Sequence, residues 1–225
     1  MRPDRPQFRI AILGGTGAQG AGLGLRLARA GHRLTIGSRD ADKARAAAVE
    51  ASARIDRRID GASNYDAANE AEIVILTVPW ISQREIVEHV LLPLQGKILI
   101  DATVPLRPHR GDIVQLPNGH SAVAAIQALA GSGVRVVSAF QNVSARHLSR
   151  FERPIDDDVL VCGDDLNACR TVIDLCLDIG VRGLYAGPIA NSAAAEALTS
   201  VLIQINRRYK VPGGAGLRIT GTLQE

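Results

Sequence analysis

The sequence predicts an α/β protein with a doubly wound parallel sheet, followed by a small C-terminal α/β domain. Short β-branched or Leu-rich runs alternate with Ala-rich helical stretches from residue 8 to about residue 140. A glycine-rich turn stands where the first run gives way to the first helical stretch. After residue 140 the elements become fewer and longer. We therefore expect one domain over residues 1–140 and a second over residues 141–225.

The order of the expected elements supports this fold. Expected strands are Phe8–Leu13, Leu34–Gly37, Ile73–Val78, Lys97–Asp101 and Val134–Ala139, with a weaker one near Arg54–Ile59. Between them we expect the helices Ala18–Ala30, Ala41–Ala51, Gln83–Leu91 and Ser121–Ala130. The second part predicts strands Val159–Cys162 and Arg182–Tyr185 and helices Leu166–Ile179 and Ser192–Arg208.

The last of these helices carries an apolar stripe at helical spacing, made of Ala194, Leu198, Val201, Leu202 and Ile205. The stripe is expected to pack on its own domain or across a dimer seam, and we expect a homodimer or a higher homo-oligomer. Cys169 and Cys176 are expected to pack in the core, because no His or Cys stands at the spacing of a metal site.

Composition excludes several classes of protein. Of the 225 residues, 46% are hydrophobic and 3% aromatic, which predicts a core of Ala, Val, Leu and Ile. The apolar runs are far shorter than the roughly 20 residues of a membrane span. No apolar segment follows the charged start MRPDRPQ, and the three cysteines form no CxxC, so we expect a cytoplasmic protein. Arginines are scattered among 23 acidic residues, which argues against nucleic-acid binding.

The glycine-rich turn predicts a dinucleotide site. Gly15, Gly17 and Gly20 satisfy GxGxxG between a strand and a helix, in the sequence GGTGAQG. Glycines at this place let the backbone approach a pyrophosphate, and the helix amino terminus offers N–H donors to it. The motif in this context indicates a Rossmann-type sheet rather than a plain tight turn.

The end of the second strand favours NADP(H) over NAD(H). An NAD enzyme places an acidic residue there for the ribose 2′-hydroxyl, whereas this chain has Gly37-Ser38-Arg39. Ser38, Arg39 and Lys43 are suited to a 2′-phosphate. Asp40 follows the turn and is expected to cap the next helix.

The reacting end of the dinucleotide is expected outside the ends of the fourth and fifth strands, which lead into Trp80 and Val104. The loop 104–119 is long enough for a lid or a binding loop. Its flanking His109 and His120 are expected at the surface.

The sequence shows no obvious acid or base for hydride transfer. It holds no Tyr-x-x-x-Lys motif and no evident His–Asp pair, and Tyr65, Tyr185 and Tyr209 lie away from the expected strand ends. We therefore predict no catalytic side chain and no metal, with a hydride passing directly between two redox rings that the protein positions.

The chain resembles the NADPH-dependent coenzyme F420 reductases, also called F420H2:NADP+ oxidoreductases. The similarity lies in ordered blocks over nearly the whole chain: ILGGTGAQG, GSRDADKA, ILTVPW, VVSAF, VLVCGDD, AGPIANS and GAGLRITG. The resemblance implies a Rossmann domain with a small C-terminal domain. It also implies hydride exchange between NADP(H) and the deazaflavin F420, which lies against the nicotinamide.

The resemblance also implies roles for individual residues. Those that would cradle the phosphates are Thr16, Gly17, Ala18 and Gln19; those that would hold the 2′-phosphate are Ser38, Arg39 and Lys43; those that would line the nicotinamide are Trp80, Val104 and Ala145. The segment Gln141-Asn142-Val143 would face the deazaflavin. The chain departs from archaeal members at Gln141, Val143 and Ala193, where those carry His, Ile and Arg.

These departures leave two alternatives open. The first is an NADPH-dependent reductase of another small acceptor, such as a pterin, a flavin or an imine. The second is a non-catalytic module that binds NADP(H) and senses redox state through a partner.

Overall fold

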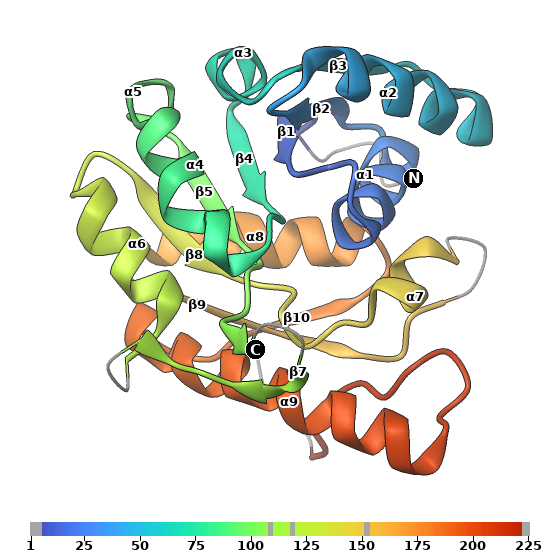
Figure 1. Cartoon of the computed structure of the whole chain (residues 1–225), viewed down its shortest axis with the longest axis vertical. Coiled ribbons are helices and arrows are strands. Elements are labelled where there is room, and N and C mark those ends of the chain that lie inside the picture. The colour runs from blue at the N-terminus through green and yellow to red at the C-terminus, as the bar shows by residue number, and fades with distance from the viewer. Residues whose placement is uncertain (1–5, 108–109, 118–119, 151–153, 222–225) are drawn as a thin grey trace.

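A computed structural model of the chain describes residues 6–107, 110–117, 120–150 and 154–221. Eight strands form one sheet in the order β10-β9-β8-β5-β4-β1-β2-β3, with helices on both faces (Figure 1). The strands of this sheet are β1 (Arg9–Leu13), β2 (Arg33–Ser38), β3 (Ile59–Ser63), β4 (Ile73–Leu76), β5 (Ile98–Asp101), β8 (Arg135–Ser138), β9 (Asp158–Gly163) and β10 (Arg182–Tyr185). The predicted doubly wound Rossmann-type α/β fold is confirmed.

Strand direction changes once in the sheet. From one edge inward, the strands β3, β2, β1, β4, β5 and β8 pair in parallel. Strand β9 then pairs antiparallel with β8, with Val137 opposite Gly163. Strand β10 then runs parallel to β9. Because both parts of the chain share this sheet, the division at residues 140 and 141 stays a prediction.

The helices pack in two layers. One apolar core joins the sheet to α1 (Ala18–Ala30), α2 (Ala41–Ile55) and α8 (Leu166–Asp178). A second core joins its other face to α3 (Asn64–Glu70), α4 (Gln83–His89), α5 (Leu91–Leu94) and α6 (Ala122–Ala130). The buried sheet residues are mostly Ile, Val, Leu and Ala, as the composition predicts.

The remaining elements surround the end of the sheet where β1, β4 and β5 finish. They are the short helices η1 (Trp80–Ser82), η3 (Ile189–Asn191) and α7 (Ala145–Ser149), the long helix α9 (Ser192–Tyr209) and a hairpin of β6 (Leu106–Arg107) and β7 (Arg110–Val114). Strand β7 runs beside α9 (Figure 1). The loop expected over residues 104–119 therefore contains a short antiparallel ribbon. Its role as a lid stays a prediction.

Two expected elements differ from the structure. The weak strand expected near Arg54–Ile59 exists but lies further along the chain: Arg54 and Ile55 finish α2, and β3 begins at Ile59. Asp56 ends the helix in a left-handed conformation with a φ of 51°. Helix α3 was not expected, although Ser63 accepts a hydrogen bond from the Asp66 N–H as its N-cap.

The apolar stripe predicted on α9 packs only partly on its own domain, and packing across a dimer seam stays a prediction. Leu202 is buried, but Val201 is 50% exposed and Ala194 is exposed as well. The face of α9 that packs inward instead presents Ser192, Ala195 and Glu196. Polar groups at the start of α6 form hydrogen bonds with this face of α9. The spacing of hydrophobic residues in the sequence does not reveal such contacts.

Cys162, Cys169 and Cys176 are buried, in agreement with core packing. Burial raises the pKa of the Cys162 and Cys169 thiols to about 11, so they are protonated at neutral pH. No helix among the described residues combines the length and hydropathy needed to cross a membrane. No cluster of metal ligands occurs within the same part of the chain.

Candidate active site

A cleft of about 650 Å³ lies at the carboxyl ends of the central strands. Twelve of the fifteen predicted cofactor- or substrate-binding residues line it: Thr16, Gly17, Ala18, Gln19, Ser38, Arg39, Trp80, Val104, Gln141, Asn142, Val143 and Ala145. The other three, Gly15, Gly20 and Lys43, do not. Residues far apart in sequence thus meet outside the carboxyl ends of the strands, which is where open α/β sheets bind their ligands.

The glycine-rich turn departs from the simple motif. Gly14, just before the predicted GxGxxG, has a φ of +77°, and a Cβ there would lie 2.7 Å from Val78 Cγ1. Gly20 is buried and does not line the cleft, and its Cβ would lie 2.5 Å from Thr77 Oγ1 and 2.8 Å from Gly15 Cα. Gly15 and Gly20 therefore serve helix–strand packing.

The amino end of α1 opens into the cleft. Gly17 is its N-cap and has no side chain to close the first turn. The first N–H groups of a helix have no partner within the helix and carry a partial positive charge. Gln19 Nε2 donates to the Phe140 carbonyl at 3.0 Å, which ties the turn to the end of β8.

At the end of β2, Ser38 and Arg39 line the cleft. Asp40 accepts hydrogen bonds from the N–H groups of Asp42 and Lys43, so its predicted role as helix cap is confirmed. These hydrogen bonds lower the pKa of the Asp40 carboxyl, and the bond from the Lys43 N–H has the largest effect. Lys43 Nζ lies 3.7 Å from Asp40 Oδ2 and outside the cleft.

The other wall of the cleft holds the three residues predicted around the nicotinamide. Trp80 begins η1 and is half-buried, so it is a cleft residue rather than a core one. Val104 follows β5, and Ala145 begins α7. Arg26 of α1 holds α7 in place by donating to the carbonyls of Leu148, His147 and Arg150.

The predicted second-substrate segment follows β8. Phe140 adopts a φ of 73°, which is rare for a bulky residue and turns the chain into the cleft. Gln141 Nε2 donates to the Asp101 carbonyl at 2.7 Å and to Ser138 Oγ at 2.9 Å. The Asn142 side chain instead donates to the Asp158 carbonyl, so its amide supports β9.

A buried carboxyl lies below the cleft. Asp101 ends β5, and its Oδ2 accepts from Gln83 Nε2 at 2.6 Å. Its Oδ1 accepts from the Thr103 N–H at 2.9 Å. Burial raises the pKa of Asp101 to about 6, against the effect of these hydrogen bonds. The network fixes the backbone from Asp101 to Thr103, which continues into Val104.

Among the described residues that line the cleft, Arg39 has the only titratable side chain. Tyr65, Tyr185 and Tyr209 lie outside the cleft and are partly or largely exposed. The sequence shows no evident His–Asp pair, whereas in the structure His32 Nε2 lies 3.3 Å from Asp178 Oδ2 and His147 Nδ1 lies 2.9 Å from Asp157 Oδ2. No residue of these two pairs lines the cleft. Of the two histidines beside the 104–119 loop, His120 is exposed, and His109 lies outside the described residues.

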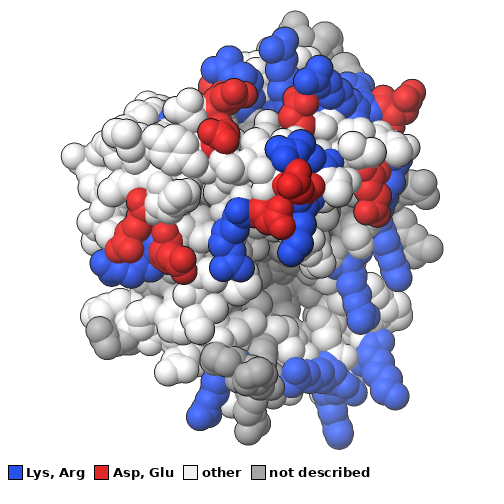
Figure 2. All heavy atoms as spheres, turned by 45° about the horizontal axis from the view of Figure 1, so that its top comes forward, with Lys and Arg blue, Asp and Glu red and all other residues white. Residues whose placement is uncertain are grey.

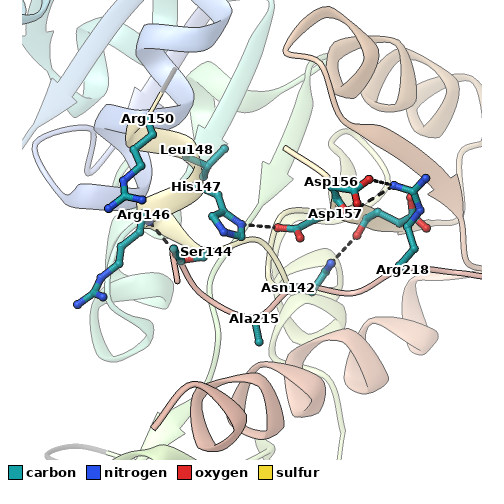
Figure 3. A network of polar contacts seen from close by, with 12 residues as sticks. Asn142, Ser144, Arg146, His147, Leu148, Arg150, Asp156, Asp157, Ala215 and Arg218 are labelled. Carbon is teal, nitrogen blue, oxygen red and sulfur yellow. Dashed lines mark hydrogen bonds and ion pairs between the residues drawn. The ribbon is translucent and has the colours of Figure 1, made fainter. Parts of the chain in front are cut away.

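The His147–Asp157 pair lies beside the last described segment. In Figure 3, His147 points toward Asp157 while Arg146 and Arg150 point away from it. Gly213 and Gly214 pass so close to His147 and Ser144 that a Cβ would meet them at 2.8 and 2.6 Å. Ala215 then reaches the cleft and lines it.

Charge on the surface is mixed. Figure 2 shows Lys and Arg interspersed with Asp and Glu over much of one face, with Lys and Arg alone along its lower edge. Several basic residues pair with acidic neighbours, as Arg84 does with Glu88 at 2.8 Å. This pattern agrees with the scattered charges of the sequence.

Several cleft residues escaped the sequence analysis, among them Asn64, Thr199 and Asn206. Asn64 follows β3, Thr199 belongs to α9, and Asn206 lies about two turns further along the same helix. Thr199 Oγ1 donates to the Gln141 carbonyl at 2.9 Å. The Ser63–Asp66 capping pattern would have located Asn64, whereas nothing local identifies the two residues on α9.

The fold and the cleft define a Rossmann-type dinucleotide-binding protein. Residues 9–105 match the family described as "NADP oxidoreductase coenzyme F420-dependent". The chain is 42% identical to the F420-dependent NADP reductase of Methanothermobacter marburgensis, over 95% of this chain and 98% of that protein. It is 41% identical to that of Methanocaldococcus jannaschii, over 95% and 98%. The chain belongs to the F420-dependent NADP reductase family.

Solved structures share the fold. A protein of Arthrobacter sp. FB24, provisionally described as an F420-dependent NADP reductase, matches with a TM-score of 0.82 and 26% identity, over 95% of this chain and all of that one. A reductive aminase of Aspergillus terreus matches with a TM-score of 0.61 and 19% identity, over 91% of this chain and 63% of that one. The latter similarity concerns the fold alone.

Proposed function

We propose that the protein transfers a hydride between NADP(H) and coenzyme F420. The observation that carries this proposal is a single cleft that joins the glycine turn to the Gln141–Ala145 wall and holds no acidic or basic side chain besides Arg39 among its described residues. Such a site suits a reaction that needs two rings held face to face. The names of the archaeal relatives support F420 as the partner.

The residues present fit NADP(H). The open amino end of α1, with Gly17 as a bare cap, suits the pyrophosphate. Arg39, at the end of β2, suits the 2′-phosphate through its forked donors, beside the Ser38 hydroxyl. Lys43 would act at longer range, since it pairs with Asp40 outside the cleft. Bound NADPH supplies the hydride, and one proton from water completes the reduction of the deazaflavin.

The nicotinamide end is formed by Trp80, Val104 and Ala145. These residues come from three segments, which Asp101 and Arg26 hold in place. Gln141 and Val143, both buried in the facing wall, would contact the deazaflavin. The exposed Arg146 and Arg150 point to solvent beside this wall and would attract the anionic tail of F420 (Figure 3).

The test is an assay of NADPH oxidation by the purified protein with oxidised F420, run beside free flavins, a pterin and a cyclic imine. We expect turnover with F420 and none with the others. Turnover only with another acceptor would contradict the proposal and favour the first alternative. Tight NADPH binding without turnover of any acceptor would favour a redox-sensing module.

We further propose a homo-oligomeric, cytoplasmic protein, with an NADP-binding part over residues 1–140 and a second-substrate part over residues 141–225. The exposed side of α9, which carries Val201, supports an interface there. Sedimentation analysis checks it: we expect a dimer or larger, and Val201→Glu should shift the protein toward monomer. A monomeric wild-type protein would contradict the interface.

A further inference from the structure

Two buried side-chain oxygens lack a hydrogen-bond partner among the described residues: Oδ1 of Asn64 and Oε1 of Gln141. The two residues are only 3% and 4% exposed. A buried acceptor without a partner destabilises the folded state, so each such atom requires an explanation. Both residues line the cleft.

The two oxygens lie toward opposite ends of the cleft. Asn64 follows β3 and Gln141 follows β8, and four strands separate β3 from β8 in the sheet. The glycine turn after β1 lies between them. A ligand that reaches both residues is therefore elongated, with its middle at the phosphate-binding turn.

Asn64 lies at the adenosine end. Its Oδ1 lies close to Gly37, where a Cβ would approach it to 3.0 Å. A side cavity of about 370 Å³ opens here and shares Ser38, Arg39 and Asn64 with the cleft. This cavity gives room for a flat base next to the predicted 2′-phosphate site.

Gln141 lies at the other end, and its neighbours fix the orientation of its amide. The Asp101 carbonyl can only accept a hydrogen bond, so it selects the NH2 group of Gln141. Oε1 must then point away from the end of β5 and has no protein donor. The side chain forms part of the cleft wall, so a small tilt of the amide presents Oε1 to a ligand.

NADP(H) carries one NH2 donor near each end: the 6-amino group of adenine and the NH2 of the nicotinamide carboxamide. We propose that Asn64 Oδ1 accepts a hydrogen bond from the adenine amino group and that Gln141 Oε1 accepts one from the carboxamide. The inference rests on the proposed binding of NADP(H). The two side-chain amides would then recognise adenine and nicotinamide. Gln141, which would also contact the deazaflavin, would orient the nicotinamide ring against it.

A crossed binding experiment tests this inference. The probes are NADP+, its hypoxanthine analogue without the 6-amino group, and its 3-acetylpyridine analogue without the carboxamide N–H. Trp80 is the only tryptophan and lines the cleft, so its fluorescence reports binding without F420. The variants are Asn64→Leu and Gln141→Met, and each is the matched control for the other.

We expect the wild-type protein to bind NADP+ about tenfold more tightly than either analogue, which equals about 1.4 kcal/mol. Asn64→Leu should lose the preference against the hypoxanthine analogue and keep the preference against the acetylpyridine analogue. Gln141→Met should show the opposite pattern. Asn64→Ala and Gln141→Leu provide second variants if a first one does not fold.

Preferences that survive in the corresponding variant would overturn the inference. If Gln141→Met changes only the KM for F420, the oxygen serves the deazaflavin, which overturns the nicotinamide assignment. Wild-type protein that does not bind NADP+ at all would contradict the proposed function itself, and the two failures are therefore distinguishable.

Discussion

Glu196 of α9 caps helix α6 through Ser121. Ser121 Oγ donates to Glu196 Oε1 at 2.6 Å, and the N–H groups of Ala122 and Val123 donate to the same carboxylate at 2.9 and 3.1 Å. Glu196 has no exposed surface. Its burial raises its pKa, while the three donors oppose that shift. This contact joins α9, which lines the cleft, to α6, which packs on the main sheet.

Replacing Glu196 with Ala should destabilise the protein by about 2–4 kcal/mol, because it leaves buried donors unpaired and creates a cavity. Urea denaturation followed by circular dichroism measures this change. Glu88→Ala is the control, since Glu88 makes only an exposed ion pair with Arg84. That control should change stability by no more than about 0.5 kcal/mol. Equal effects of both variants would contradict the capping role.

Asp101→Asn should change how stability depends on pH. The folded-state pKa of Asp101 is raised from 3.8 to about 6, so the native state holds this proton longer than the unfolded state does. Stability should therefore fall as pH rises from about 4 to 6, by about 3 kcal/mol for this group.

The measurement is the free energy of unfolding of both proteins between pH 4 and pH 7. The Asn variant lacks this titration, so its stability relative to wild type should improve as the pH rises. Parallel curves for the two proteins would show that Asp101 does not titrate in this range.

Arg39→Ala should raise the Kd for NADPH by at least about tenfold and leave the Kd for NADH unchanged. The reason is that only NADPH carries the 2′-phosphate. Lys43→Ala should have a smaller effect, because Lys43 pairs with Asp40 and does not line the cleft. Equal losses for NADPH and NADH in the Arg39 variant would refute the assignment of this residue.

Gly20→Ala should destabilise the fold by about 1–3 kcal/mol, because its Cβ would clash with Thr77 Oγ1 and with the turn itself. Gly17→Ala is the matched control. Gly17 has a φ of −81°, and its Cβ would come no closer than 3.4 Å to the Gly14 carbonyl oxygen. Thermal unfolding should separate the two variants, and both should bind NADPH more weakly. Equal melting temperatures would contradict the packing role of Gly20.

The parts of the site that depend on local chemistry could be predicted from the sequence. The glycine turn, the helix cap at Asp40 and the residues after β2 and β4 follow from glycine conformation, capping and strand ends. The expected bounds of α1 and β10 agree with the structure. These features need only a few neighbouring residues.

The features that depend on contacts between distant residues could not be predicted. Glu196 meets Ser121 across 75 positions, and Gln141 meets Asp101 across 40. The stripe on α9 packs only partly on its own domain for the same reason, because a polar cap takes the place of apolar packing on its inward face. The His147–Asp157 pair is only ten positions apart, but no local sequence pattern shows that the two side chains meet.

The residues that form the cleft walls are spread between Gly14 and Ala215. They lie on both sides of the point between β8 and β9 where the strand direction changes. No small fragment of the chain contains a complete cleft, so a ligand binds only when most of the structure has formed. Binding is then thermodynamically linked to global folding. A dinucleotide present at 100 times its Kd would add about 2.7 kcal/mol to the stability of the whole chain. Cellular NADP(H) would in this way protect the protein from unfolding and proteolysis.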